Sequence, residues 1–362
     1  MSEDILKKLA VVLDTLPNGF PATEDGLEIK ILKEIFEPDE AELFCQLTLN
    51  FETPESIAKR AGLPIEGLED KLVVMWNKGQ IFGVDFGTAK VFKMVPWVFG
   101  IYEFQLNRLT KEFARMVEDY MWIFGPQFAE NKPQFMQVLP IEEDIDTSEG
   151  QAPMPYEAVS KIIESGQAFA VNDCICKKEM GLLDEPCDKP IEVCLAISPV
   201  PGVFDNNPQN AREITKEEAY EVLRKSEEAG LVHMTGNYQN GHFFICNCCG
   251  CCCGILKGIN KLGLSEVVNT AYYAEIDTEE CVSCGICLEE RCQIEAILEK
   301  EDTYEVIKDK CIGCGLCITT CPSEAIKLVR KNAEDIVEPV VNEKEWFRLR
   351  GEKRGVDISK YL

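Results

Sequence analysis

The sequence predicts an α+β protein of several domains. Its 362 residues are too many for one compact core and imply at least two domains. The first half shows helical apolar spacing followed by two short strand-like runs, whereas all of the 19 cysteines except Cys45 lie after residue 170. We therefore expect a metal-free first half and a cysteine-rich second half.

The composition is that of an acidic folded protein. There are 37 basic and 63 acidic residues, giving a net charge of −26, and 46% of the residues are hydrophobic. These values exclude a mainly disordered chain. The longest charge-free stretch, Ala229 to Leu256, contains cysteines, amides and glycines that a bilayer core would not accept, so no transmembrane segment is expected.

The first residues carry Glu3 and Asp4 and only a short apolar stretch, unlike a signal peptide. We therefore expect a cytoplasmic location. Structural disulfides are rare in that reducing compartment, so the cysteines indicate metal binding or redox chemistry.

The first hundred residues are predicted to form helices followed by a two-stranded hairpin. Thr53 and Pro54 supply an N-cap and a first helical residue. The expected elements are Ala41 to Asn50, Pro54 to Gly62, Ile65 to Lys78, Ile81 to Val84 and Val91 to Val95. This order resembles a winged helix-turn-helix. Cys45 is interpreted as a core thiol of its helix.

A winged helix-turn-helix implies DNA binding, but the charge of the third helix argues against that use. Glu66, Glu69 and Asp70 outnumber Lys71 and Lys78 there, and a helix that reads DNA needs the opposite balance. We therefore interpret residues 1–100 as a winged-helix-like docking module and expect no nucleic-acid partner.

Residues 101–165 are predicted to form an amphipathic helix and a proline-rich linker. Apolar residues recur at helical spacing from Tyr102 to Phe124. Lys132 to Pro155 contains four prolines and an acidic run, which is typical of an extended linker at a domain boundary. Further along, Thr215 and Glu218 form a capping box that predicts a helix through Ala229.

Two cysteine runs near the C-terminus have the spacing of iron-sulfur ligands. The second run is C-x2-C-x2-C-x3-C-P, which lets three thiolates of one tight loop meet three corners of a cubane while the fourth points elsewhere. Gly285, Gly313 and Gly315 permit the loops to turn backbone amides toward sulfur. The runs are Cys281, Cys284, Cys287 and Cys292, and Cys311, Cys314, Cys317 and Cys321.

These runs resemble the bacterial two-cluster 4Fe-4S ferredoxin over about Ala274 to Val329. The resemblance implies two crossed ligand sets, Cys281, Cys284, Cys287 with Cys321, and Cys311, Cys314, Cys317 with Cys292. The sequence departs from the family pattern once, because four residues separate Cys287 from Cys292 and Gln293 replaces the usual proline. The alternative of two zinc ribbons leaves the third and fourth cysteines of each run unexplained.

Ten further cysteines form less familiar patterns, C-x-C-x10-C-x6-C and CNCCGCCC. Side chains of adjacent residues point in different directions, so the cysteines of CNCCGCCC cannot all face one cluster. They must bind in at least two directions. Taking every third residue gives one loop of Cys246, Cys249 and Cys252, and an offset set of Cys248 and Cys251 with Cys253 beside it. Further ligands are expected from Cys174, Cys176, Cys187 and Cys194.

These ten thiols allow two more 4Fe-4S clusters, or one larger or non-cubane cluster. Two Cys-Cys-Gly tripeptides, at 248–250 and 252–254, faintly resemble the CCG modules of heterodisulfide reductases, although the long spacings of that family are absent. A zinc or copper thiolate site and a reactive-thiol site are the remaining alternatives. The expected cofactors are thus two 4Fe-4S clusters in 281–321 and one or two more clusters in 174–253.

The sequence contains neither a G-x-G-x-x-G after a strand nor a G-x-x-x-x-G-K-[ST] loop, so hydride and substrate chemistry are expected in another subunit. We predict an iron-sulfur protein that relays single electrons in anaerobic metabolism as a non-catalytic subunit of an oxidoreductase complex. The expected partner is a flavoprotein or another oxidoreductase subunit. Two alternatives are a redox-sensing regulator that uses the winged module, and a reductase with an unusual cluster at CNCCGCCC.

The predicted domains follow from these patterns. After the docking module (1–100) and the helix and linker (101–165), we expect a cysteine-rich iron-sulfur domain at 166–273 and a ferredoxin-like two-cluster domain at 274–330. Residues 331–362 are expected to form an arm that packs on this or another subunit.

Overall fold

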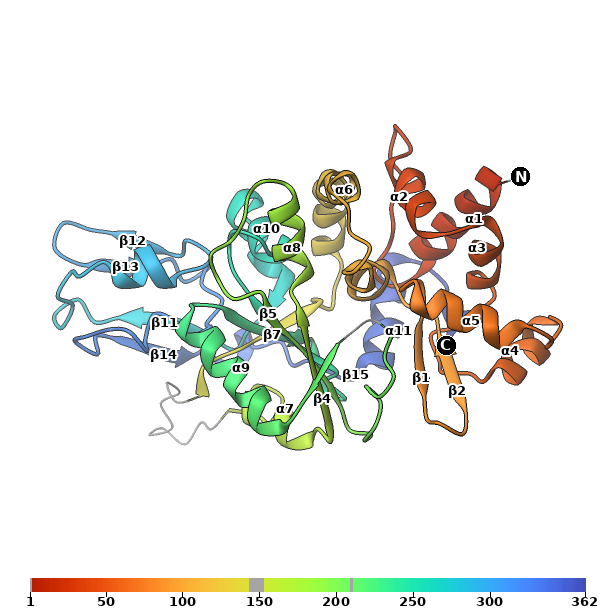
Figure 1. The fold of residues 1–362 in the computed structure, drawn as a ribbon. Coiled ribbons are helices and arrows are strands. Elements are labelled where there is room, and N and C mark those ends of the chain that lie inside the picture. The colour runs from red at the N-terminus through yellow and green to blue at the C-terminus, as the bar shows by residue number, and fades with distance from the viewer. Residues whose placement is uncertain (1, 143–152, 209–210) are drawn as a thin grey trace.

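The computed structural model describes residues 2–142, 153–208 and 211–362. A helical unit lies at one end, a sheet covered by helices lies in the middle, and a small unit of hairpins lies at the other end (Figure 1). Helices and strands are mixed, as the predicted α+β class requires. Residues 143–152, which belong to the predicted linker of Lys132 to Pro155, lie outside the described residues.

The N-terminal unit contains five helices and a hairpin. The predicted first helix is displaced: it runs from Pro38 to Phe44 rather than from Ala41 to Asn50, because Glu37 and Glu40 form a capping box that starts it earlier. The winged-helix identity of this unit stays a prediction. The elements are α1 (Ser2–Thr15), α2 (Leu27–Ile35), α3 (Pro38–Phe44), α4 (Pro54–Ala61), α5 (Leu68–Asn77), β1 (Phe82–Asp85) and β2 (Lys90–Lys93).

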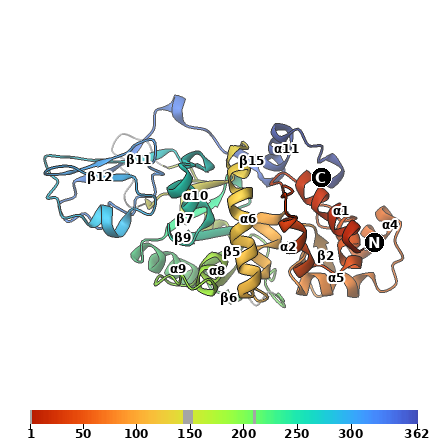
Figure 2. The ribbon, with the colours of Figure 1, turned by 90° about the horizontal axis from the view of Figure 1, so that it is seen from above.

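The long amphipathic helix is present but shifted along the chain. Helix α6 spans Lys111–Glu130, not Tyr102 to Phe124, because the Thr110 hydroxyl accepts a hydrogen bond from the Phe113 amide and starts the helix there. Residues 97–105 instead form short irregular turns. Helix α6 lies between the sheet and the N-terminal helices (Figure 2).

The central sheet has seven strands in the order β10-β3-β7-β9-β5-β4-β6, all antiparallel except the β10–β3 pair. The predicted linker is therefore wrong in part, because Met136–Leu139 is a strand. Pro133 and Pro140 flank this apolar run rather than interrupt it. The strands are β3 (Met136–Leu139), β4 (Ala168–Asp173), β5 (Glu192–Ser198), β6 (Arg212–Ile214), β7 (Val232–Gly236), β9 (Phe244–Cys248) and β10 (Val268–Asn269).

Helices cover both faces of this sheet. Helices α7 (Val159–Ser165) and α9 (Lys216–Glu228) share a core with one face, and α6, α8 (Ile175–Leu182) and α10 (Gly254–Leu262) pack on the other. The predicted capping box of α9 is confirmed, since Thr215 accepts a hydrogen bond from the Glu218 amide at 3.1 Å.

The remaining chain forms the hairpin unit and then returns to the N-terminal end. The hairpin unit contains β11 (Tyr272–Ile276), β12 (Ile297–Glu299), β13 (Tyr304–Val306) and β14 (Ile326–Arg330). The C-terminal arm packs on its own chain: β15 (Val340–Asn342) pairs with β8 (Tyr238–Asn240), and α11 (Glu343–Arg354) follows. The buried Arg350 of α11 donates to the carbonyl oxygens of Pro17 and Asn131.

Candidate metal centres

The two cysteine runs of the hairpin unit repeat one backbone conformation. Strand β11 pairs with β14, and β12 pairs with β13. Ser283 and Gly313 occupy matching positions with φ of 53° and 61°, and Glu295 and Glu324 match with φ of 50° and 54°. The repeat seen in the sequence is therefore also a repeat of the chain path around the thiols.

One set of four thiols, which we call the outer thiol set, lines a small cavity at the end of the molecule. Cys284 is exposed, whereas Cys287 is buried. Burial acts to raise the pKa of Cys281, but hydrogen bonds from the Ser283 and Tyr304 amides contribute to outweighing it and leave that pKa lowered. The set consists of Cys281, Cys284, Cys287 and Cys321.

A second set, the inner thiol set, lines a cavity beside the central body. Burial raises the pKa of Cys314 to about 12. The amide of Ala296 donates to the sulfur of Cys292 at 3.2 Å, and the Ile141 amide that follows β3 donates to the Cys314 carbonyl oxygen. The set consists of Cys292, Cys311, Cys314 and Cys317.

The extra residue between Cys287 and Cys292 is absorbed by a π-helical turn, η5 (Cys287–Arg291), in which the Cys292 amide donates to the Cys287 carbonyl oxygen. The turn directs Arg291 toward helix α9, where its side chain is 5% exposed. The guanidinium donates to the carbonyl oxygens of Leu316 (2.8 Å) and of residues 227–228 in the last turn of α9 (2.9 and 3.1 Å). Arg291 is not among the functional residues that the sequence predicts, although the four-residue gap between Cys287 and Cys292 is a signal of it.

The second departure from the ferredoxin pattern, Gln293, contacts the CNCCGCCC segment. The Gly250 amide donates to Oε1 of Gln293, and Nδ2 of Asn260 donates to its carbonyl oxygen, both at 3.0 Å. A Cβ atom on Gly250 would stand 2.1 Å from that carbonyl oxygen, so only glycine fits. The inner thiol set therefore lies against the turn that carries the upstream cysteines.

The ten upstream cysteines separate into two groups that differ from the predicted every-third-residue sets. Cys246 and Cys248 lie on β9 two residues apart and so share a face, whereas Cys249 begins the turn that follows. The prediction was wrong because it applied one spacing across a strand, a turn and a helix start. The four-thiol group contains Cys187, Cys249, Cys251 and Cys252, and the six-thiol group contains Cys174, Cys176, Cys194, Cys246, Cys248 and Cys253.

The six-thiol group lines a cavity of about 120 Å³ that α6, α8 and α10 also border. Cys246 is within hydrogen-bonding reach of Cys194 and Cys248, and Cys248 of Cys253. Contacts with neighbouring thiols and burial raise the pKa of Cys246 well above its usual value. The thiol of Cys246 is therefore protonated without metal, and a bound metal would displace its proton. The rest of the lining is mostly apolar and includes Trp122.

Buried acidic residues near the six-thiol group add little negative charge. Burial raises the pKa of Glu103 to about 8, although the Gly100 amide donates to its carboxylate. Burial likewise raises the pKa of Glu179 to about 7. Glu118 instead pairs with Lys257 at 2.7 Å. The acidic residues therefore add little negative charge around the cavity. Such surroundings suit a metal group that is itself negatively charged by several thiolate ligands.

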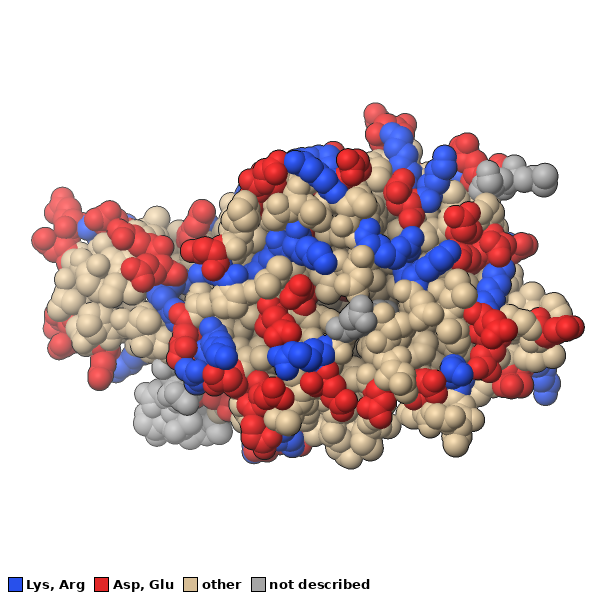
Figure 3. Space-filling model, viewed as in Figure 1, with Lys and Arg blue, Asp and Glu red and all other residues tan. Residues whose placement is uncertain are grey.

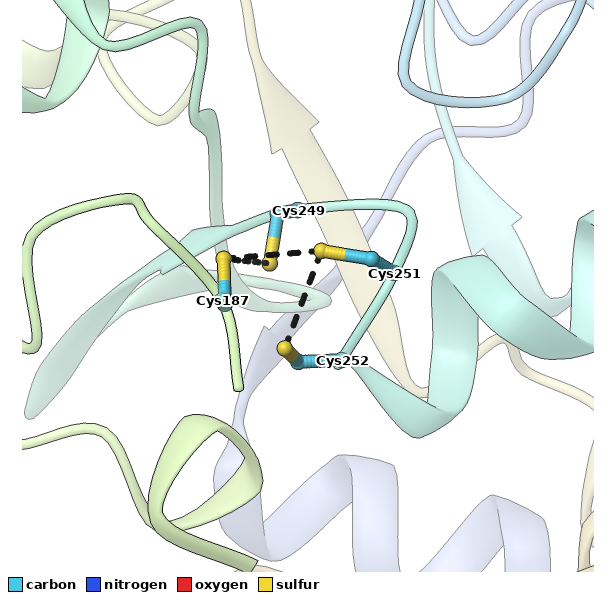
Figure 4. Close-up of side chains that lie close together, drawn as sticks. All are labelled: Cys187, Cys249, Cys251 and Cys252. Carbon is cyan, nitrogen blue, oxygen red and sulfur yellow. Dashed lines mark hydrogen bonds between the residues drawn. The ribbon is translucent and has the colours of Figure 1, made fainter. Parts of the chain in front are cut away.

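The four-thiol group is compact (Figure 4). Cys187 comes from the loop between α8 and β5, and the other three cysteines come from the turn between β9 and α10. Sulfur–sulfur distances are 3.8 Å from Cys187 to Cys249, 3.5 Å from Cys187 to Cys251 and 3.7 Å from Cys251 to Cys252. Hydrogen bonding from Cys252 lowers the pKa of Cys249 to about 5, which makes this thiol the readiest of the group to ionise.

The comparisons with known proteins identify one part of the chain. Residues 274–328 match the family model described as a 4Fe-4S dicluster domain. No curated protein and no solved structure matches the chain. The chain therefore contains a 4Fe-4S dicluster domain, which confirms the ferredoxin-type prediction for this region. Within the part of the chain that the structure describes, no helix has the length and apolar character needed to span a bilayer.

Proposed function

We propose that this chain is an electron-transfer subunit that relays single electrons between a redox partner and a second centre at its own six-thiol group. The observation that carries the proposal is the contact of Gly250 with Gln293, which joins the dicluster domain to the turn next to that group. A 4Fe-4S cluster supplies one-electron chemistry when it is bound, with a potential set by charge, exposure and hydrogen bonds to sulfur.

The outer and inner thiol sets would each hold one cluster. Each cavity is lined by three cysteines of one run and the fourth cysteine of the other, which supports the crossed ligand sets that the ferredoxin resemblance implies. The exposed Cys284 makes the outer set the side that faces a partner. The inner set, in which Cys317 is buried and none of the four thiols is exposed, would face the six-thiol group, which we expect to hold at least one further iron-sulfur cluster.

The surface around the outer set fits a basic partner. Acidic side chains gather over this end of the molecule (Figure 3). Such a surface steers a positively charged patch toward the exposed thiols. We propose that the partner is a flavoprotein or another oxidoreductase subunit. Both proteins would act in the cytoplasm, in anaerobic metabolism. The exposed acidic residues are Glu275, Asp277, Glu279, Glu280, Glu289, Glu290, Glu295, Glu299, Glu301, Asp302, Glu305, Asp309 and Glu324.

A reductase is the second candidate function, favoured by the apolar cavity beside the six-thiol group. The cavity extends from these thiols past Trp122 to Leu264 and Val267, so it contains more than the ligand shell of a cluster. A small apolar substrate that alters the spectrum of the upstream centre would favour this reading. If none of the small substrates tried alters the spectrum, the electron relay remains the favoured function.

The relay can be tested with the anaerobically purified full chain. Gly250→Ala should push the turn away from Gln293, whereas Gly181→Ala in α8 meets open space and serves as the matched control. After partial reduction, freeze-quench paramagnetic resonance should show slower electron exchange between the dicluster and the upstream centre in Gly250→Ala alone. An iron content of about eight per chain, meaning two cubanes and no upstream iron, would refute the relay.

A further inference from the structure

The four-thiol group has the dimensions of a site for one metal ion. The sulfurs of Cys187, Cys249, Cys251 and Cys252 all lie within 4.8 Å of one another, and three of the pairs are 3.5–3.8 Å apart. Zinc–sulfur bonds of about 2.3 Å in a tetrahedron place the sulfurs about 3.8 Å apart. The observed separations therefore match four thiolates around a single ion.

A cubane requires a wider arrangement. Its four thiolates bind four different irons and point away from one another, so their sulfurs are separated by the spacing of the irons in addition to the metal–sulfur bonds. The same structure provides an internal comparison. Within residues 2–142, 153–208 and 211–362, no set of dicluster thiols comes as close together as the four-thiol group.

The chain positions of the ligands also favour one ion. Three thiols come from a turn of four residues, and the fourth comes from a loop 62 residues earlier. A short turn can wrap three donors around one ion, as the short spacings of structural zinc sites do. Gly250 lies inside the turn, and its amide donates to the side chain of Gln293. The dicluster domain therefore also holds the turn in place.

We propose that Cys187, Cys249, Cys251 and Cys252 bind one zinc ion in a closed tetrahedral site. Four protein thiolates leave no open position, so the ion has a structural role. It ties the α8–β5 loop to the β9–α10 turn. Cys248 and Cys253 lie on either side of that turn and line the six-thiol cavity, so the zinc ion sets where these two thiols stand. The proposal is independent of the electron relay, which needs iron at other cysteines.

The test counts zinc and iron in the full chain, expressed with both metals supplied and purified without oxygen. We expect one zinc per chain. The extended X-ray absorption fine structure above the zinc edge should report four sulfur neighbours at about 2.3 Å and no nitrogen or oxygen neighbour. Because this measurement uses the unaltered protein, it stands even where a variant fails to fold.

Two double variants then identify the ligands. Cys187→Ala with Cys251→Ala should lose the zinc equivalent, whereas Cys174→Ala with Cys194→Ala, the matched pair in the six-thiol group, should keep it. Absence of zinc from the unaltered protein, zinc retained by the first variant, or iron lost from the dicluster in its place would overturn the proposal. Failure of the relay would appear separately, as an iron content of about eight with zinc present.

Discussion

Replacing Arg291 by alanine should loosen the dicluster domain from the rest of the molecule. Its guanidinium makes two hydrogen bonds across this interface, to the carbonyl oxygens of residues 227–228, and two within the dicluster domain, to the carbonyl oxygen of Leu316 and the hydroxyl of Thr319. The side chain is 5% exposed, so water does not compete for these bonds in the folded protein.

The size of the effect follows from these contacts. At a net contribution of about 1 kcal/mol for each hydrogen bond, the two bonds to α9 set an upper end of about 2 kcal/mol. The two carbonyl oxygens at the end of α9 can be hydrated once the side chain is gone, which sets a lower end of about 1 kcal/mol. The undocked population should rise by roughly 5-fold to 30-fold, without unfolding of the whole chain.

Hydrogen exchange of the full chain measures this opening locally. Amides in 287–293 and 311–319 should exchange faster in Arg291→Ala by that factor, while amides of the N-terminal helices stay unchanged. Arg224→Ala is the matched control, because Arg224 lies on α9 and pairs with the exposed carboxylates of Glu221 and Glu228, and it should leave these exchange rates unchanged. Equal exchange in the Arg291 variant and the unaltered protein would refute the assigned role of this side chain.

Three further predictions address the ligands, the pH dependence and the docking module. Cys321→Ala with Cys281→Ala should leave one paramagnetic cluster signal intact, whereas Cys321→Ala with Cys311→Ala should perturb both; a spared cluster in the second variant would mean that each run holds its own cluster. Burial lowers the pKa of His242 to about 4, so its contribution to stability should be full above about pH 6.5 and lost as the pH falls toward 4, at up to roughly 1.4 kcal/mol per pH unit. Urea unfolding at pH 7 and pH 5 should show a smaller pH effect for His242→Gln, and equal effects would contradict this reasoning. The full chain should show no salt-sensitive binding to duplex DNA, and specific binding would favour the regulator.

Much of the fold was predictable where neighbouring residues decide the structure. The helix of Lys216–Glu228 begins where its capping box predicts, because the cap acts within one turn. The linker prediction was wrong at Met136–Leu139, because so short a run forms a strand only when β7 and β10 lie beside it. The predicted start of this long helix was wrong for a related reason. Apolar residues continue at helical spacing upstream of Thr110, but the N-cap at Thr110 starts α6 there.

The sequence by itself determined that the chain carries a 4Fe-4S dicluster domain, because the thiols of each run are spaced within one tight loop and the spacing alone limits which of them can meet one cluster. Only the tertiary structure decided how the ten upstream thiols divide into four and six. Cys187 meets Cys249 from 62 residues away, and Cys194 meets Cys246 across neighbouring strands. Such meetings depend on how strands pair and how helices cover them, and linear spacing carries no information about either. The same reason explains Arg291 and Gln293: the sequence shows only a departure from the ferredoxin pattern, and the fold shows that Arg291 contacts the end of α9 and that Gln293 contacts the CNCCGCCC turn.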